Sequence, residues 1–175
     1  MSVAEMNSID STIGFNENNL DFIKQSRREE GGVYKKYRFF YTVGLFKFLL
    51  EDDIKVENLH EHTINAMPYA PEWCSGVISV RGVIMPVVNM HAFLKTGIDA
   101  SPKKNKLIIL DHRNHSPIAL MIDRLPEVMF KDDYVIEKSP DKSPSWLANI
   151  MKNKTVTVYE VDHSELLKKL RYTQI

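Results

Sequence analysis

The sequence contains a single cysteine, Cys74, so no disulfide can form within the chain, and a reducing compartment is favoured. Its longest apolar runs fall well short of the roughly 20 residues that cross a bilayer as a helix. Residues 1–10 carry acids but no basic cluster of the kind that opens a secretory signal peptide. We therefore expect a cytoplasmic protein without direct membrane insertion.

The chain also lacks an excess of either charge. Lys and Arg number 23, Asp and Glu number 23, and the net charge is +0. Nucleic-acid binders usually carry a basic surplus, so the balance argues against a nucleic-acid partner. The 175 residues, 43% hydrophobic and 26% charged, have an ordinary globular composition and suit about one domain.

Signatures of catalysis and of metal binding are missing as well. The 7 glycines include no Gly-x-Gly that could cradle a phosphate, and no serine stands in a nucleophile-elbow motif. The 6 histidines lack the cysteine partners that structural zinc sites usually have, so exposed loop positions account for them better. We expect no enzyme, no metal site and no cofactor.

A β-branched stretch over residues 74–94, CSGVISVRGVIMPVVNMHAFL, dominates the sequence. β-Branched residues favour strands, and the Arg81-Gly82 pair interrupts the run as a turn would. We therefore predict strands over 76–80 and 83–88. Arg81 stands between two apolar segments, where a charged group is normally paired or directed at a partner, and we expect it to be at least partly buried.

The flanking segments predict short strands with few helices. The spacing and charge order of residues 15–30, followed by two glycines, predict a helical arm. Alternation around Gly44 indicates a hairpin over 37–50, and apolar runs predict strands over 106–110 and 118–122. The remaining predictions are a helix or strand over 54–59, short helices over 90–96 (capped by Asn89, ended by Gly97) and 164–170, and a loop over 131–145. Many short strands indicate a β-barrel or sandwich.

The central stretch resembles the signature of the CheW-like family, the adaptor domains of bacterial chemotaxis-type signalling. The segment 122–125, Ile-Asp-Arg-Leu, is similar to the family's Val-Asp-x-Val, and Glu57 stands where the family has an acid. Asn89 departs from the usual Asp, and Lys55 replaces an apolar residue. The resemblance covers about residues 33–171, and the signature positions that match are Gly76, Val80, Arg81, Gly82, Ile84, Pro86, Val87, Val88 and Met90.

The resemblance implies an all-β fold of two packed five-stranded β-barrels with short peripheral helices. Together with the helical arm, it divides the chain into a flexible N-terminus and arm over residues 1–32 and a CheW-like domain over residues 33–175. The implied function is a non-enzymatic adaptor that couples the cytoplasmic tip of a methyl-accepting chemoreceptor to the regulatory domain of a histidine autokinase. Such an adaptor is cytoplasmic and recruited to membrane-associated receptor arrays. The arm and Trp73 are closer to the type IV pilus, or twitching-motility, branch.

The resemblance also implies a protein-binding site. We predict that Glu57 and Arg81 form a partly buried bidentate pair at the seam between the barrels, with Val56, Val80 and Gly82 shaping a groove beside it. Two roles remain open for the pair: it either fixes the seam or contacts a partner directly. If the pair is fully buried, removing one member costs about 3–5 kcal/mol.

Two other functions remain open. One is a divergent CheW-like scaffold without kinase coupling, which Asn89 and Lys55 keep in consideration. The other is a small β-barrel that binds nucleic acid or a small ligand; nucleic-acid binding would require a basic groove with interleaved aromatic residues.

Overall fold

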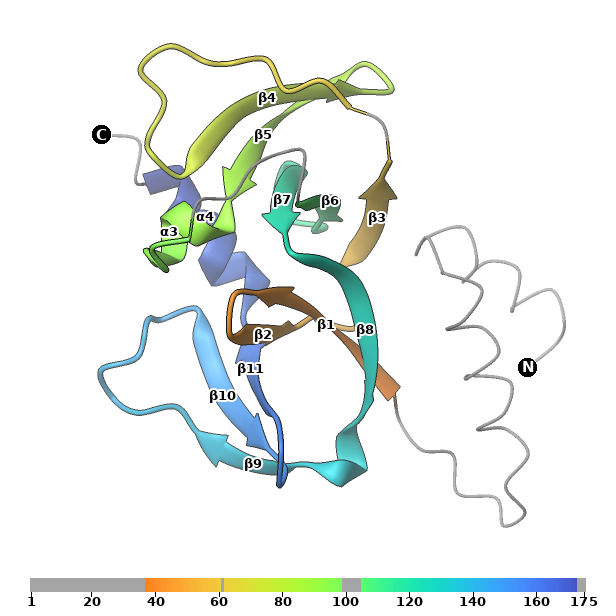
Figure 1. Ribbon diagram of the computed structural model, residues 1–175, viewed down its shortest axis with the longest axis vertical. Helices are drawn as coiled ribbons and strands as arrows, with labels where there is room; N and C mark the ends of the chain where they lie inside the picture. The colour runs from red at the N-terminus through yellow and green to blue at the C-terminus, as the bar shows by residue number, and fades with distance from the viewer. Residues whose placement is uncertain (1–36, 61, 99–104, 173–175) are drawn as a thin grey trace, which may run out of the picture.

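The computed structural model describes residues 37–60, 62–98 and 105–172 (Figure 1). The helical arm predicted over residues 15–30 lies outside these described residues. Within them, strands assemble into two sheets, with helices at their periphery. No helix in the described segments has the length and apolar character needed to cross a membrane.

Sheet A contains six strands in the order β8-β1-β2-β11-β10-β9. The predicted hairpin around Gly44 is confirmed as β1 and β2, and Gly44 takes the left-handed φ of 60° that the turn requires. The strand bounds are β1 (Tyr37–Val43), β2 (Phe46–Leu49), β8 (Arg124–Phe130), β9 (Val135–Lys138), β10 (Leu147–Lys152) and β11 (Thr157–Val161).

Sheet B contains five strands in the order β3-β6-β7-β5-β4. The strands predicted on either side of Arg81-Gly82 are confirmed as β4 and β5, and the segment over 54–59 is a strand rather than a helix. Pro86 is tolerated within β5 because the pairing of β5 with β7 begins only at Val87. The N–H that proline lacks is therefore not needed for a hydrogen bond to β7. The bounds are β3 (Lys55–Leu59), β4 (Cys74–Val80), β5 (Val83–Asn89), β6 (Lys106–Asp111) and β7 (Ile118–Ile122).

Among the described residues, two α-helices accompany the sheets, α3 (Met90–Leu94) and α4 (His163–Tyr172). The predicted cap of α3 is confirmed, because the Asn89 side chain accepts a hydrogen bond from Ala92 N at 3.1 Å. Its predicted end at Gly97 is wrong. Lys95 takes the left-handed conformation, with φ 52°, and ends the helix first.

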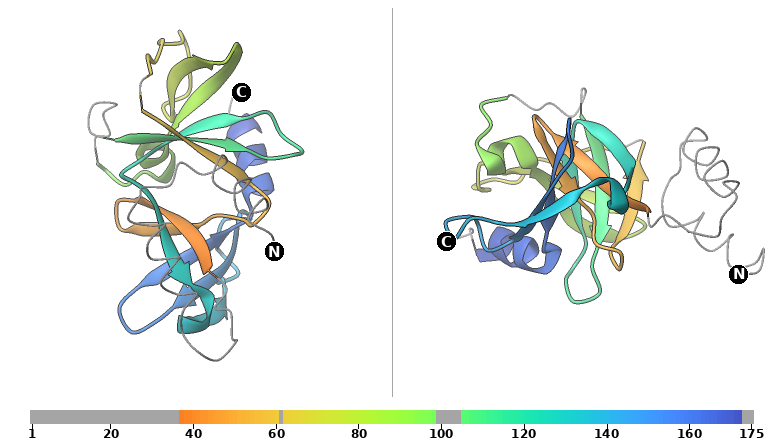
Figure 2. Two further views of the ribbon diagram at one scale, coloured as in Figure 1. Left: turned by 90° about the vertical axis from the view of Figure 1, so that its right-hand side faces the viewer. Right: turned by 90° about the horizontal axis from the view of Figure 1, so that it is seen from below.

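The main hydrophobic core joins the two sheets. Tyr41 and Phe48 from sheet A, Val88 and Leu120 from sheet B, and Leu166 from α4 are buried in one cluster. Figure 2 shows α4 beside the junction of the sheets, which its leucines help to cover. The prediction of an all-β fold with two packed units is therefore confirmed.

The predicted strand count differs in sheet A, which has six strands rather than five. The additional strand, β9, falls within the segment over 131–145 that the sequence predicts as a loop, where a short 3-10 turn, η1 (Lys131–Asp133), also forms. All side chains of β9 are exposed, so no alternation between buried and solvated residues marks the strand in the sequence. The strand orders also leave each sheet open, so neither forms a hydrogen-bonded closed barrel within the described residues.

Candidate functional site

Arg81 and Glu57 form a bidentate ion pair. Arg81 Nη1 donates to Glu57 Oε2 at 2.9 Å, and Nη2 donates to Oε1 at 2.6 Å. Arg81 occupies the β4–β5 turn with a positive φ of 51° and is followed by Gly82 with φ 80°. A two-point contact of this kind fixes the plane of the guanidinium as well as its position.

The predicted place of this pair at the seam is wrong, and so is the predicted burial of Arg81, whereas Glu57 is half-buried as predicted. The Arg81 side chain is 76% exposed and the Glu57 side chain 39%. Both residues belong to sheet B. The β4–β5 hairpin of this sheet extends beyond the core, and Val83 and Ile84 are exposed at its tip. Since β3 and β4 are the opposite edges of sheet B, the pair links the two edges of a strongly curled sheet.

A groove of about 300 Å³ surrounds the ion pair. Four of the five predicted site residues line it: Val56, Glu57, Val80 and Arg81. Gly82 does not line it, and no atom lies within 4 Å of the place where a side chain on Gly82 would begin. The other lining residues are Lys55, Val83, Met85, Ile109, Asp111 and Pro117.

The lining combines apolar side chains with two cations, Lys55 and Arg81, and two anions, Glu57 and Asp111. An apolar floor with a rim of both charges suits a protein surface better than a polyanion. Sequence reasoning missed Ile109 and Asp111 because they reach the groove only through the β3–β6 register, in which Glu57 lies opposite Ile109 and Lys55 opposite Asp111.

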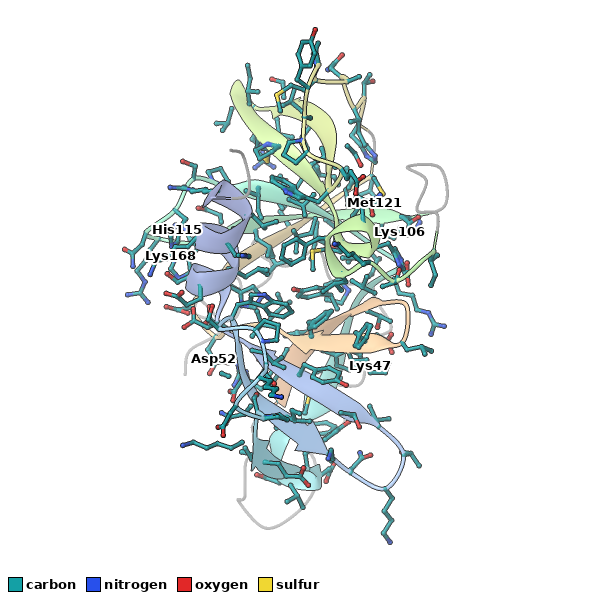
Figure 3. The ribbon with its side chains drawn as sticks, turned by 90° about the vertical axis from the view of Figure 1, so that its left-hand side faces the viewer. Lys47, Asp52, Lys106, His115, Met121 and Lys168 are labelled. Carbon is teal, nitrogen blue, oxygen red and sulfur yellow. The ribbon has the colours of Figure 1, made fainter. Side chains whose placement is uncertain are left out.

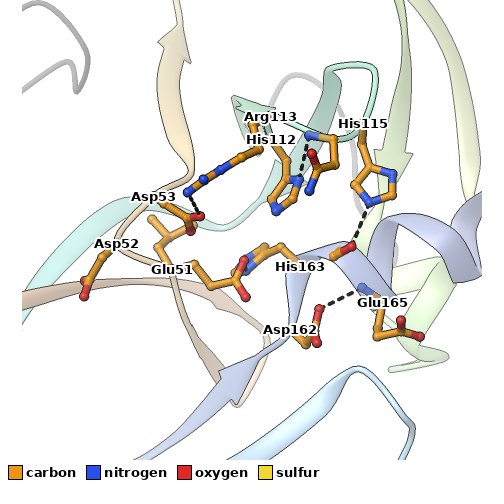
Figure 4. Close-up of polar contacts among 12 residues, drawn as sticks. Glu51, Asp52, Asp53, His112, Arg113, His115, Asp162, His163 and Glu165 are labelled. Atoms are coloured by element: carbon orange, nitrogen blue, oxygen red, sulfur yellow. Dashed lines mark hydrogen bonds and ion pairs between the residues drawn. The ribbon is translucent and has the colours of Figure 1, made fainter.

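The histidines are more buried than the sequence predicts. His91, His112 and His163 are buried, so the interpretation as exposed loop residues is wrong for all three. Figure 4 shows His112, His115 and His163 near the start of α4, where His115 Nε2 lies 2.8 Å from Ser164 Oγ. In the described part of the chain, no group of three or more His, Cys, Asp or Glu side chains is arranged to hold a metal ion.

Asp123, not Arg81, lies at the junction of the sheets. Its carboxylate accepts hydrogen bonds from Gly44 N at 2.6 Å and Asn105 Nδ2 at 2.8 Å, and lies 2.7 Å from His91 Nε2. Burial by itself would raise the pKa of Asp123, but hydrogen bonds from His91, Gly44 and Asn105 outweigh it and hold the pKa below its usual value.

The sequence profile of the CheW-like domain family matches residues 55–171. The chain belongs to the CheW-like domain family. Strands β1 and β2 precede the matched range, yet β1 pairs with β8 and β2 with β11 inside it, so they are part of the same CheW-like sheet.

Curated relatives agree with this membership. A probable chemotaxis protein CheW of Rhizobium etli is 28% identical over 78 residues, which are 45% of this chain and 50% of that protein. Chemotaxis protein CheW of Rhizobium meliloti is 32% identical over 76 residues, 43% of this chain and 48% of that protein. Protein PilI of Pseudomonas aeruginosa is 30% identical over 56 residues, 32% of each chain. The chain thus spans about half the length of the two CheW relatives.

A solved structure shows the same fold. Scaffolding protein TtCheW from Thermoanaerobacter tengcongensis superposes with a TM-score of 0.60 at 19% identity, covering 74% of this chain and 90% of that chain. The CheW-like fold that the central stretch predicts is therefore confirmed.

Proposed function

We propose that this CheW-like protein is a non-enzymatic adaptor that couples methyl-accepting chemoreceptors to a histidine autokinase. The observation that carries the proposal is the groove of sheet B, with its oriented Arg81–Glu57 pair, in a CheW-like fold. The description of TtCheW as a scaffolding protein supports the adaptor role, and the similarity to PilI supports a pilus-motility output.

On the kinase side, the groove receives the regulatory domain. Val56 and Val80 supply apolar surface, Glu57 holds the guanidinium of Arg81 in one plane, and Gly82 leaves room above the turn. Arginine is enriched among the residues that dominate protein interfaces, because it combines a stackable plane with several donors. The exposed Val83 and Ile84 beside it extend the apolar contact.

On the receptor side, the cytoplasmic tip of the chemoreceptor binds as a helix in a groove. A kinase contact confined to sheet B leaves sheet A and the junction of the sheets accessible to this second partner. The adaptor thus acts in the cytoplasm and is recruited to receptor arrays at the membrane.

Isothermal titration of the protein with the regulatory domain of the source organism's chemotaxis-type kinase tests the proposal. We expect saturable micromolar binding that Arg81→Ala weakens about tenfold or more. Arg113→Ala is the matched control, because Arg113 forms another exposed ion pair, with Asp53, outside the groove. Failure of the wild-type protein to bind would refute kinase coupling. Equal weakening by both variants would refute a specific role for Arg81.

A divergent scaffold without kinase coupling is the second candidate function. The presence of Asn89 in place of the family's usual Asp gives this candidate little support. The Asn89 side-chain oxygen caps α3, a role that the family's usual Asp would also fill. Lys55 lines the groove, so it affects partner choice more than folding. Receptor binding without kinase binding in the titration would favour this candidate.

A further inference from the structure

A second cavity, of about 190 Å³, is formed by α4 and sheet B, and shares only Pro117 with the groove around Arg81. Its walls are apolar and come from segments far apart in the sequence. Leu167 and Leu170 are three residues apart and so lie on one face of α4. The other walls come from the residue before β4, from β5 and from the start of β7: Trp73, Val88 and Ile118. All five of these side chains belong to the buried core.

The mouth of this cavity carries a cation. Ser116 and Arg171 are the polar residues among the described residues that line it, and both are exposed. Arg171 lies in the last turn of α4. Lys168 in the same helix is paired with Glu165 at 2.7 Å, whereas no described carboxylate lies within ion-pair distance of Arg171. The guanidinium of Arg171 is therefore available to an anion that enters the cavity.

Positive charge prevails on this side of α4. Partial burial is the main reason why the pKa of His115 is lowered, and the charges of Arg171, His112 and Lys168 lower it further, against Asp162. Figure 3 shows His115 and Lys168 close together beside α4. The same charges that disfavour a proton on His115 favour a negative charge on a ligand nearby.

Trp73 contributes a hydrogen-bond donor without an acceptor. Its Nε1 is buried and has no hydrogen-bond partner among the described residues. A buried N–H without an acceptor is costly, and most such groups in folded proteins are satisfied. A ligand oxygen in the cavity that Trp73 lines would supply the acceptor.

We propose that this cavity binds a small carboxylic acid whose apolar body is about the size of one aromatic ring. The carboxylate accepts hydrogen bonds from Arg171 at the mouth and from the Nε1–H of Trp73. The apolar body packs against the leucines of α4. This binding site goes beyond the adaptor function and does not depend on it.

The size and charge of the cavity disfavour other classes of ligand. A cavity of about 150 Å³ holds a benzene molecule, so about 190 Å³ leaves room for one ring and a short acidic arm. One guanidinium matches one carboxylate, whereas a polyanion would require further cations. A neutral apolar molecule would fill the cavity but leave the Trp73 N–H without an acceptor.

NMR of the 15N-labelled full chain, titrated with phenylacetate, tests the proposal. The sequence contains 2 tryptophans, so Trp146→Phe leaves the indole N–H signal of Trp73 alone and assigns it. Trp146 packs against Phe48 and Phe93, and phenylalanine keeps an aromatic ring there. We expect a saturable shift of the Trp73 signal, with a dissociation constant of about 1 mM or tighter. Absence of a saturable shift would overturn the site itself.

Two further molecules separate the two halves of the ligand. Acetate carries the charge without the ring, and 2-phenylethanol carries the ring without the charge. We expect both to bind at least about fivefold more weakly than phenylacetate, because each loses one set of contacts. Equal binding of 2-phenylethanol would overturn carboxylate recognition, and equal binding of acetate would overturn the role of the apolar walls.

Arg171→Gln tests the cation at the mouth. The side chain is exposed, so the variant is expected to fold. Lys169→Gln is the matched control, because Lys169 is an exposed cation of the same helical turn that does not line the cavity. We expect Arg171→Gln to weaken phenylacetate binding about fivefold and to leave 2-phenylethanol binding unchanged, and the control to change neither. Equal weakening by both variants would overturn the role of Arg171.

Thermal melts provide a second readout. A ligand that binds only the folded chain raises its melting temperature, so phenylacetate should raise that of the wild-type protein more than that of Arg171→Gln. An equal rise in both would contradict recognition of the carboxylate by Arg171. Kinase coupling is tested by its own titration, so failure of the ligand site and failure of the adaptor function are distinguishable.

Discussion

Arg81 and Glu57 connect the two edge strands of sheet B through an ion pair that faces solvent. The two hydrogen bonds, 2.6 and 2.9 Å long, have good geometry. However, the 76% exposure of the arginine side chain keeps both charges hydrated, so the Coulomb attraction is largely screened. The pair therefore orients a guanidinium at a groove and adds little to stability.

Arg81→Ala should consequently lower the free energy of unfolding by only about 0.2–1 kcal/mol. Urea denaturation followed by circular dichroism measures this change, and Arg113→Ala provides a second exposed ion pair for comparison. A loss of about 3–5 kcal/mol in Arg81→Ala alone would show instead that the pair behaves as a buried one.

Gly76→Ala should destabilise the protein substantially. Gly76 has φ 134°, and a Cβ there would lie 2.3 Å from Asn65 O, the atom that accepts from Val77 N at 2.9 Å. Backbone strain of about 1–3 kcal/mol then adds to the loss of the contact that covers the edge of β4.

The matched control for this substitution is Gly97→Ala. Gly97 also has a positive φ, of 74°, but nothing lies within 4 Å of its added Cβ, so only backbone strain applies. Urea denaturation of both variants should give the larger loss for Gly76→Ala. Equal losses would mean that the Asn65 contact does not limit position 76.

Asp123→Asn should remove part of the acid sensitivity of the fold. The folded-state pKa of Asp123 lies below 3.8, its ordinary value, so the unfolded chain takes up the proton first as the pH falls. The carboxylate therefore stabilises the fold above about pH 4, and this contribution is lost as the pH falls through the folded-state pKa. Urea denaturation at several pH values should show the wild-type advantage over Asp123→Asn shrinking in acid. A constant difference would contradict the assignment.

His115→Gln should reduce the loss of stability in mildly acidic solution. Partial burial, with Arg171, His112 and Lys168 nearby, holds the pKa of His115 below 6.5, and Asp162 opposes them. The unfolded chain thus binds the proton more readily, and stability falls as the pH drops below about 6.5. Glutamine keeps a hydrogen-bonding group toward Ser164 without titrating. Thermal melts at about pH 7 and about pH 5 should differ less for the variant, and an equal difference would contradict this role of His115.

Local sequence patterns predicted most of the strands because the side chains of those strands are buried or half-buried, and burial selects apolar residues. Buried apolar runs marked β6 and β7, and the glycine at position 44 marked the hairpin. The four exposed residues of β9 carry no such contrast, so only their pairing with β10 identifies them as a strand. The end of α3 was misplaced because Lys95 takes a backbone conformation that usually belongs to glycine.

The sequence by itself determined the all-β class, the turn at Arg81-Gly82 and, through resemblance, the pairing of Arg81 with Glu57. These depend on local propensity and on residue identity. Only the tertiary structure decided that this pair faces solvent, because exposure depends on how far the β4–β5 hairpin extends beyond the core. It also decided that Asp123 joins the sheets, since Gly44, His91 and Asn105 meet that carboxylate only after three separate segments have folded around one crossover.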